Sequence, residues 1–244
     1  KDIVTEGDFG MSYFSGRPVF DEIWPRFLVT IRMSLLILVI SVCVGVPVGI
    51  YSAVKQYSLW DTVPTMMAFF LAAVPSFVIG MVLMYFFALK INIFPSFGLS
   101  GLKSYILPVS AVAISEAAAY LRFTKSSMLE AIRQDYVRTA RGKGVPERTV
   151  IWKHAMRNAL LPVITCVGMR FGVLLAGMVT TERLFSIPGI GSLIVDSISK
   201  KDEPVIIAAS ILIASAFTML MLLVDIAYAY VDPRIRAKYS RLER

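Results

Sequence analysis

Histidine and cysteine are almost absent from this chain of 244 residues. It contains one histidine, His154, and two cysteines, Cys43 and Cys166, and no CxxC pair occurs. A histidine-rich metal site within a membrane is therefore excluded, and the sequence predicts no metal ligands. Both cysteines lie in hydrophobic runs, where we expect them to act as small packing residues. His154 lies in a polar loop, where a helix surface or an interface is its simplest role.

Charged residues are also scarce, at 17% of the chain against 57% hydrophobic residues, and the mean hydropathy is +0.69. This composition excludes an ordinary soluble domain. A bilayer core of about 30 Å needs about 20 apolar residues in a helix. Four runs meet or approach this length, and a shorter fifth run contains Glu116. We therefore predict an all-α polytopic membrane protein with five spans, which are Met33–Ala53, Met66–Leu89, Ile106–Leu121, Leu160–Thr181 and Val205–Tyr230.

An initiator methionine and a signal peptide are missing from the start of the sequence. The first residues, KDIVTEGDFGMSYFSG, are polar, and such a segment does not easily reach the outer side of a membrane without a preceding signal or span. We expect a further hydrophobic helix before it, so that the intact protein has six spans with both ends in the cytosol. Residues 1–27 are then an extracytoplasmic segment, 28–230 the transmembrane domain and 231–244 a cytoplasmic tail. Residues 19–24 are expected to form an amphipathic helix that leads into the first span from Pro25.

Positive charges are unevenly divided between the two sides of the predicted membrane domain. The loop after the third span, the C-terminal tail and Lys55 together carry fifteen lysines and arginines, against eight on the other side. The positive-inside rule therefore places residues 122–160 and the C-terminus in the cytoplasm and the N-terminus outside. The net charge of +8 reflects this asymmetry and favours anionic lipid as a partner. It gives no reason to expect nucleic acid.

Prolines and glycines indicate where the spans bend and pack. Pro47 and Pro75 lie inside the first and second predicted spans and are expected to kink them. The pairs Gly45/Gly49 and Gly168/Gly172 have the small-xxx-small spacing that lets helix backbones approach closely. This spacing is common in membrane helices, so it predicts packing faces and no particular function.

The predicted cytoplasmic region has an unusual pattern for a loop. The third span is expected to continue as a helix to about Tyr136, and Gly142 and Gly144 then interrupt it. A second helix, Pro146–Asn158, follows, and Pro162 begins the next span. A short rigid helix across the ends of two spans is suited to act as a lever for a docked partner. Its periodicity alone fits an amphipathic helix on the inner leaflet equally well.

Several stretches resemble one family, in order along nearly the whole chain. RTARGKG followed by KHAMRNALLP resembles the cytoplasmic signature of permease subunits of binding-protein-dependent ABC importers. Arg138-Thr139-Ala140 stands for the EAA of that signature, with Gly144 and Leu161-Pro162 following. The long interval between the glycine and LP is similar to the dipeptide, oligopeptide and nickel branch. Other similar stretches are GDFGMSYFSGRPVFDEI at 7–23, DYVRTARGKG at 135–144, HAMRNALLPVIT at 154–165, TERLFSIPGIGSLIVDSI at 181–198 and VDPRIR at 231–236. The stretch KKDEPVI at 200–206 departs from the usual Arg/Lys-Asp-Tyr-Pro-Val form.

The resemblance implies the transmembrane domain of a type I ABC importer in the cytoplasmic, or inner, membrane of a prokaryote. Such a chain pairs with a second homologous permease, two ATPases dock beneath, and an extracytoplasmic binding protein delivers the substrate. The chain lacks the GxxxxGK[ST] phosphate loop, so we expect no catalytic residues and no bound cofactor, and the partner ATPases use the ATP and Mg²⁺. The ATPase-coupling residues that the resemblance implies are Arg138, Thr139, Ala140, Gly144, Pro146, Glu147, Trp152, His154, Arg157, Asn158, Leu161 and Pro162.

Polar residues in and near the spans are candidates for a translocation pathway. Arg170 lies mid-span, where a charge costs about 2.5–3.5 kcal/mol, and it either lines the pathway or forms a structural ion pair with Glu116 or Asp225. The turn-rich stretch at 185–191 is expected to form an outer gate or a contact for the binding protein, with a plain interfacial loop as the alternative. The candidate pathway residues are Glu116, Arg170, Glu182, Phe185, Pro188 and Gly189.

Two other functional classes remain open beside the importer permease. An ion-driven secondary transporter typically shows inverted repeats and broken midplane helices with paired acids. That class leaves the elaborate cytoplasmic region unexplained. A structural membrane scaffold explains the packing motifs but not the polar outer stretch FSIPGIG at 185–191. Within the importer branch, the sequence leaves open whether the substrate is a di- or oligopeptide, a nickel chelate or another small solute. Selectivity is expected to reside largely in the binding protein.

Overall fold

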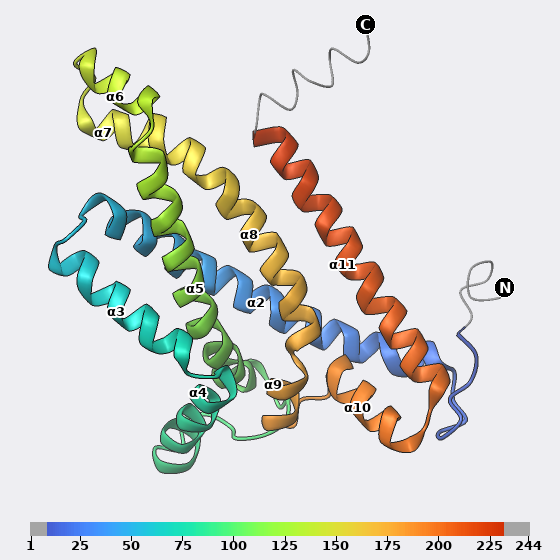
Figure 1. Ribbon diagram of the computed structural model, residues 1–244. Helices are drawn as coiled ribbons and strands as arrows, with labels where there is room; N and C mark the ends of the chain where they lie inside the picture. Colours follow the sequence, from blue (N-terminus) through green and yellow to red (C-terminus); the bar gives the residue numbers. More distant parts are fainter. Residues whose placement is uncertain (1–8, 232–244) are drawn as a thin grey trace, which may run out of the picture. The chain divides into compact units, whose positions relative to one another are not determined.

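The structure, a computed structural model, describes residues 9–231, and helices joined by short turns and loops make up most of this range (Figure 1). Within that range the only strand-like contact is one isolated bridge between Met11 and Pro18. The all-α prediction is therefore confirmed. The elements are α2 (Val19–Val54), α3 (Leu59–Ala73), α4 (Ser76–Leu83), η1 (Met84–Lys90), η2 (Leu102–Tyr105), α5 (Ile106–Ile132), α6 (Asp135–Gly142), α7 (Glu147–Thr149), η3 (Val150–Ala155), α8 (Met156–Gly177), α9 (Val179–Leu184), α10 (Ile190–Lys200) and α11 (Glu203–Val231).

Membrane-spanning capacity agrees with the predicted number of spans. Four helical stretches in the described range are long and apolar enough to cross a membrane, and a fifth is added if the bent pair α3 and α4 is one span. The predicted cytoplasmic tail lies outside the described residues from 232 onward. The chain divides into two compact units. The first contains residues up to Ile37 with Pro75–Val112 and Phe171–Met219, and the second contains Leu38–Val74, Ala113–Arg170 and the residues from Leu220.

The second predicted span, Met66–Leu89, is wrong as one continuous helix. Helix α3 ends at Ala73, Val74 has an extended backbone (φ −93°, ψ 123°), and α4 begins only at Ser76. A residue before proline is driven from helical into extended conformations, and the proline itself has no N–H to donate. Pro75 therefore breaks the helix where a kink was expected.

Two other boundaries also differ from the predictions, and both involve proline. Helix α2 runs without interruption from Val19 to Val54, so Pro25 lies within it and does not separate an amphipathic helix from a span. Pro162 likewise lies inside α8, and the helical run from Glu147 continues through η3 into α8. A proline near the start of a long helix removes one hydrogen bond, and burial of the apolar side of the helix offsets this loss.

The second unit is held together by close packing of α2 against α5. A Cβ added at Gly45 would lie 2.5 Å from the carbonyl oxygen of Ala117, and one at Gly49 would lie 2.6 Å from that of Leu121. These neighbours are backbone atoms, so they cannot move aside. The small-xxx-small prediction is confirmed for this pair of glycines, because only glycine permits this approach.

In α8 the second pair of glycines also marks a packing face. A side chain on Gly168 would collide with Val224 in the second unit, and one on Gly172 would collide with Phe217 in the first. Both contacts are with α11. Helix α5 ends at Ile132, four residues before its predicted end at about Tyr136. The helix is therefore interrupted before Gly142 and Gly144, and α6 begins at Asp135.

The first unit has its own apolar core. Val19 and Ile23 of α2 are fully buried and pack with Ile190 of α10 and Val205 of α11. A short hairpin of residues 10–18 precedes α2, and the N–H of Val19 donates to the carbonyl of Gly10 at 3.0 Å. The hydroxyl of Ser12 and the N–H of Tyr13 donate to the carboxylate of Asp202, so the 10–18 hairpin lies against the turn between α10 and α11.

Candidate functional site

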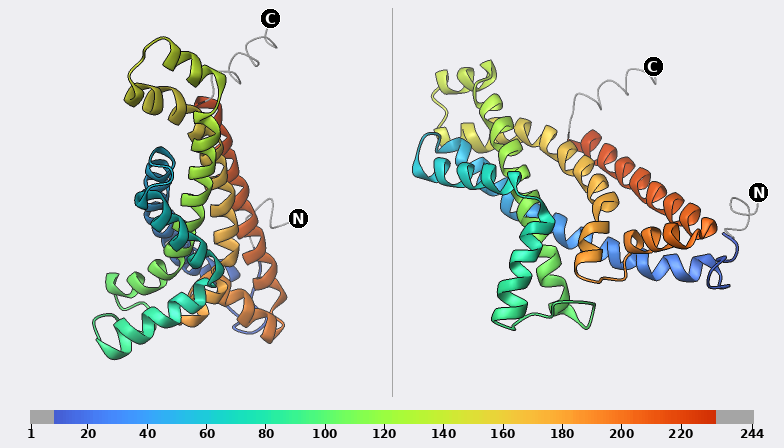
Figure 2. Two further views of the ribbon diagram at one scale, coloured as in Figure 1. Left: turned by 60° about the vertical axis from the view of Figure 1, so that its left-hand side comes forward. Right: turned by 60° about the horizontal axis from the view of Figure 1, so that its bottom comes forward.

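The predicted coupling region folds as a small helical hairpin in the second unit. Helix α6 packs against η3, and the two lie at the end of α5 in Figure 1 and in both views of Figure 2. We call Asp135–Ala155 the α6–η3 hairpin. Its pattern of exposure decides which side is available to a partner.

One side of the α6–η3 hairpin is apolar and buried. Val137 and Val150 are completely buried and belong to one cluster with Ala53 of α2 and Met128 of α5. The hydroxyl of Ser127 on α5 also donates to the carbonyl of Ala159 on α8, at 2.7 Å. The hairpin therefore rests on the ends of α2, α5 and α8.

The opposite side of the hairpin is exposed and carries several basic residues. Trp152 is 53% exposed, and a surface hollow is lined by Arg148, Thr149, Trp152 and Lys153. Among the predicted coupling residues, Ala140 is buried and His154 and Leu161 are half-buried. The exposed ones are Arg138, Thr139, Gly144, Pro146, Glu147, Trp152, Arg157, Asn158 and Pro162.

The turn between α6 and α7 is closed by backbone and side-chain contacts. Gly144 has φ +75° and donates its N–H to the carbonyl of Arg141 at 2.9 Å. The guanidinium of Arg141 donates two hydrogen bonds to the carboxylate of Glu147, with N–O distances of 2.6 and 3.0 Å. The left-handed conformation favours glycine at 144. The turn is thus a defined corner that sets the angle between the two arms of the hairpin.

A second polar contact lies within the predicted spans. The guanidinium of Arg170 on α8 binds the carboxylate of Glu116 on α5 through two N–O contacts of 2.8 and 3.1 Å. The guanidinium also lies 5.9 Å from the centre of the Tyr120 ring. The predicted ion pair with Glu116 is therefore present, while the side chain of Asp225 lies outside what the structure describes. A place for this pair in a translocation pathway stays a prediction.

Comparison with known proteins identifies the family. The family described as "Binding-protein-dependent transport system inner membrane component" matches residues 45–237. The glutathione transport system permease protein GsiC of Escherichia coli (strain K12) is 40% identical over 235 residues, which are 96% of this chain and 77% of that protein. The protein of the same name from Salmonella typhimurium (strain LT2) has the same identity and coverage. The chain belongs to this family of transport permeases.

Solved structures agree with this assignment at the level of the fold. A structure of the inward-facing MetNI methionine ABC transporter matches with a TM-score of 0.71 at 15% identity, over 87% of this chain and 97% of that chain. A crystal structure of an amino acid ABC transporter with histidines matches with a TM-score of 0.64 at 15% identity, over 86% and 92% of the two chains. The resemblance to ABC importer permeases of the dipeptide, oligopeptide and nickel branch is confirmed. An ATPase, a substrate-binding protein and a bacterial inner membrane are implied for the permease.

Glu182, one of the candidate pathway residues, is the centre of a buried hydrogen-bond network in the first unit. Glu182 is completely buried, and its carboxylate accepts hydrogen bonds from the hydroxyl of Thr30 at 2.5 Å and from the N–H of Ser192 at 2.7 Å. Thr30 in turn accepts the N–H of Ile190 at 3.0 Å. Burial raises the pKa of Glu182 above its ordinary value, although these hydrogen bonds act in the opposite direction. Glu182 thus holds the 185–191 turn in shape.

The remaining predicted residues of this turn differ in exposure. Phe185 and Gly189 are buried, and a side chain on Gly189 would overlap the carboxylate of Glu182. Pro188 is exposed. If the turn acts as an outer gate or a binding-protein contact, Pro188 is the residue that can touch a partner, and Phe185 and Gly189 only maintain the shape of the turn. This role of the turn stays a prediction.

Sequence reasoning missed several partners of these residues. Thr30 lies 152 residues from Glu182, and Ser12 lies 190 residues from Asp202, to whose carboxylate it donates a hydrogen bond of 2.5 Å. No spacing rule connects such pairs. The only signal at Asp202 was its place in a stretch that departs from the usual family form.

Proposed function

We propose that this permease forms one half of the membrane channel of an ATP-driven importer for glutathione or a similar short peptide. The observation that carries the proposal is the 40% identity, over 96% of this chain, to permeases named for glutathione transport. Identity at this level along the whole membrane domain supports a related substrate better than the fold does, since the fold is shared with amino acid and methionine transporters.

The proposal includes a second, homologous permease and two ATPases as partners. The ATPase seat is the exposed side of the α6–η3 hairpin, around Trp152 and Arg138, because its other side is buried against the permease itself. This side lies in the cytoplasm with the C-terminus, as the distribution of lysine and arginine predicts. The ATPases bind ATP and Mg²⁺, and the binding protein delivers substrate from the opposite side.

Transport follows from a difference in stability between two packings of the spans. ATP binding draws the docked ATPases together, which moves the α6–η3 hairpins and favours an outward-open packing, and hydrolysis restores the inward-facing one. The permease itself contributes no catalytic group to hydrolysis. An ion-driven secondary transporter has no support from the family assignment.

The substrate is tested by uptake in the native cell. We expect deletion of the gene to abolish uptake of labelled glutathione at micromolar concentration, and a plasmid copy to restore it. The same strains are compared for uptake of labelled dipeptide and of a nickel chelate. Loss of nickel uptake with unchanged glutathione uptake would overturn the peptide assignment and leave the importer family intact.

A further inference from the structure

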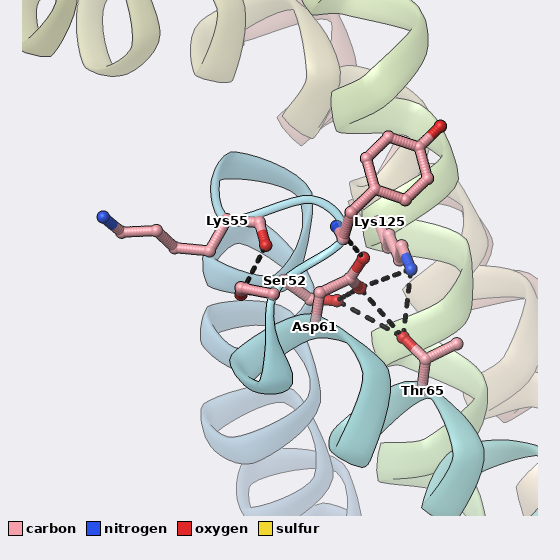
Figure 3. Close-up of polar contacts among 7 residues, drawn as sticks. Ser52, Lys55, Asp61, Thr65 and Lys125 are labelled. Carbon is pink, nitrogen blue, oxygen red and sulfur yellow. Dashed lines mark hydrogen bonds and ion pairs between the residues drawn. The ribbon is translucent and has the colours of Figure 1, made fainter.

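A buried ion pair in the second unit connects α3 to α5. Asp61 lies in the first turn of α3, and the ammonium nitrogen of Lys125 on α5 is 2.5 Å from its Oδ1. The side chains are 6% and 17% exposed. Figure 3 shows the two side chains turned toward one another between the helices.

The same carboxylate also binds α2 and the turn that follows it. The hydroxyl of Ser52 on α2 donates to Oδ1, and the N–H of Tyr57 in the turn donates to Oδ2 at 3.0 Å. Thr65, one turn along α3, donates to Oδ1 at 3.1 Å and accepts a hydrogen bond from Lys125 at 3.0 Å. Three helices and one turn therefore meet at a single charged group (Figure 3).

This cluster lies directly beside the base of the α6–η3 hairpin. Met128 follows Lys125 by three residues on α5, and Ala53 follows Ser52 on α2, and both belong to the apolar cluster that contains Val137 and Val150 of the hairpin. Residues three apart in a helix lie on the same face. The ion pair is thus placed one helical turn from the surface on which the hairpin rests.

The energetics argue for a role beyond stability. A buried ion pair typically adds little over well-packed apolar residues of similar volume, since the cost of removing both charges from water offsets their attraction. What such a pair does supply is a fixed register, because an unpaired buried charge is strongly unfavourable. Sliding of α5 against α3 would separate the two charges and leave each one buried without its partner, a cost that an apolar contact does not impose.

We propose that Asp61 and Lys125 are positioning residues that transmit motion of the α6–η3 hairpin to α2 and α3. The pair holds the end of α5, the α2–α3 turn and the start of α3 as one piece. A displacement of the hairpin by a docked ATPase then moves α2 and α3 together with α5. This inference rests on the proposed function, in which the hairpin is the ATPase seat.

The test uses the assembled importer in proteoliposomes with its binding protein and substrate. In the double variant Asp61→Asn/Lys125→Met both charges are removed, no buried charge is left unpaired, and the approximate shapes are kept. We expect ATPase co-purification to stay within twofold of the native protein and substrate transported per ATP to fall at least about fivefold, the lower end of ordinary coupling effects. Lys125→Arg keeps the charge and should retain at least half of the native ratio.

Lys55→Gln is the matched control. Lys55 lies in the same turn and is exposed, and its side chain points away from the cluster in Figure 3. Lys55→Gln removes one positive charge from the same region, as the change at Lys125 does, and should leave the transport ratio unchanged. If the double variant couples normally, the positioning role is wrong.

Two further measurements keep the result decisive. If the double variant fails to assemble, Ser52→Ala removes only the link to α2 and leaves the ion pair in place. A lowered transport ratio then supports the proposal and an unchanged ratio overturns it. A separate variant, Trp152→Glu, tests the proposed docking site itself. If the ATPase co-purifies with this variant as well as with the native permease, the docking site lies elsewhere, and this result does not depend on the ion pair.

Discussion

Asp202 and Glu182 show how single carboxylates are held in the first unit. Burial acts to raise the pKa of Asp202, but hydrogen bonds from the Ser12 hydroxyl and from the N–H groups of Tyr13, Phe14 and Val205 outweigh it and lower the pKa. At Glu182 burial dominates and the pKa is raised. The balance between burial, which favours the neutral acid, and hydrogen bonds, which favour the carboxylate, therefore decides the direction of each pKa shift. Asp202 in this way fastens the 10–18 hairpin to the start of α11.

Acidification is expected to loosen this hairpin. Because the folded-state pKa of Asp202 is lowered, its contribution to stability is present above the unfolded-state value of about 3.9 and is lost as the pH falls through the lower folded value. Hydrogen exchange of residues 11–15, corrected for the intrinsic rate, should therefore be faster at pH 3 than at pH 6. In Asp202→Asn this difference should disappear. An equal pH response in the variant would show that another group controls the hairpin.

At the scale of the element, glycines and prolines decide how the helices meet and where they end. Gly45 and Gly49 bring the backbone of α2 against that of α5, and Pro75 separates α3 from α4. Pro25 and Pro162 leave their helices unbroken. Proline therefore has no single outcome in this chain, because the packing around each one determines whether the helix continues.

Replacement of Gly49 by valine should destabilise the second unit. The new Cβ would lie 2.6 Å from the carbonyl oxygen of Leu121, so the helices must separate, at a cost of about 1–3 kcal/mol. Thermal unfolding in detergent, followed by circular dichroism, should show a lower midpoint. Ala72→Val is the control, since it adds a similar bulk at an exposed position of α3. Equal midpoints for the two variants would contradict the close approach of α2 and α5.

For the whole molecule, the α6–η3 hairpin is the surface that we propose as the docking site of the ATPase. Its apolar side is completed by α2 and α5, so only the basic side is left for a partner. The corner at Gly144 sets the direction of the two arms. The lever that the sequence predicted, Pro146–Asn158, is therefore not a separate short helix, because the helical run that begins at Glu147 continues through η3 into α8 without a break.

Gly144→Val should uncouple ATP hydrolysis from uptake. A β-branched residue at φ +75° is strained by about 1–3 kcal/mol, and no neighbouring atom lies within 4 Å to add a clash, so the effect is confined to the turn. We expect membrane insertion to be unchanged, uptake to fall about tenfold, and ATPase activity of the complex to fall less than twofold. Gly142→Ala, at the last residue of α6 and without a positive φ, should behave as the native protein. Native uptake in Gly144→Val would exclude this turn from coupling.

The sequence by itself determined the class and the family, and it predicts the position of the coupling region. These follow from apolar runs, the placement of lysine and arginine, and motifs such as RTARGKG. Such features involve residues that are close in the sequence, so they can be recognised without knowing how the helices pack. Only the tertiary structure decided which charges meet. Lys125 lies 64 positions from Asp61 and Arg170 lies 54 from Glu116, and several other charged residues were equally available as partners. Such choices are made when helices pack, because a buried charge is stable only beside the particular group that the packing brings to it.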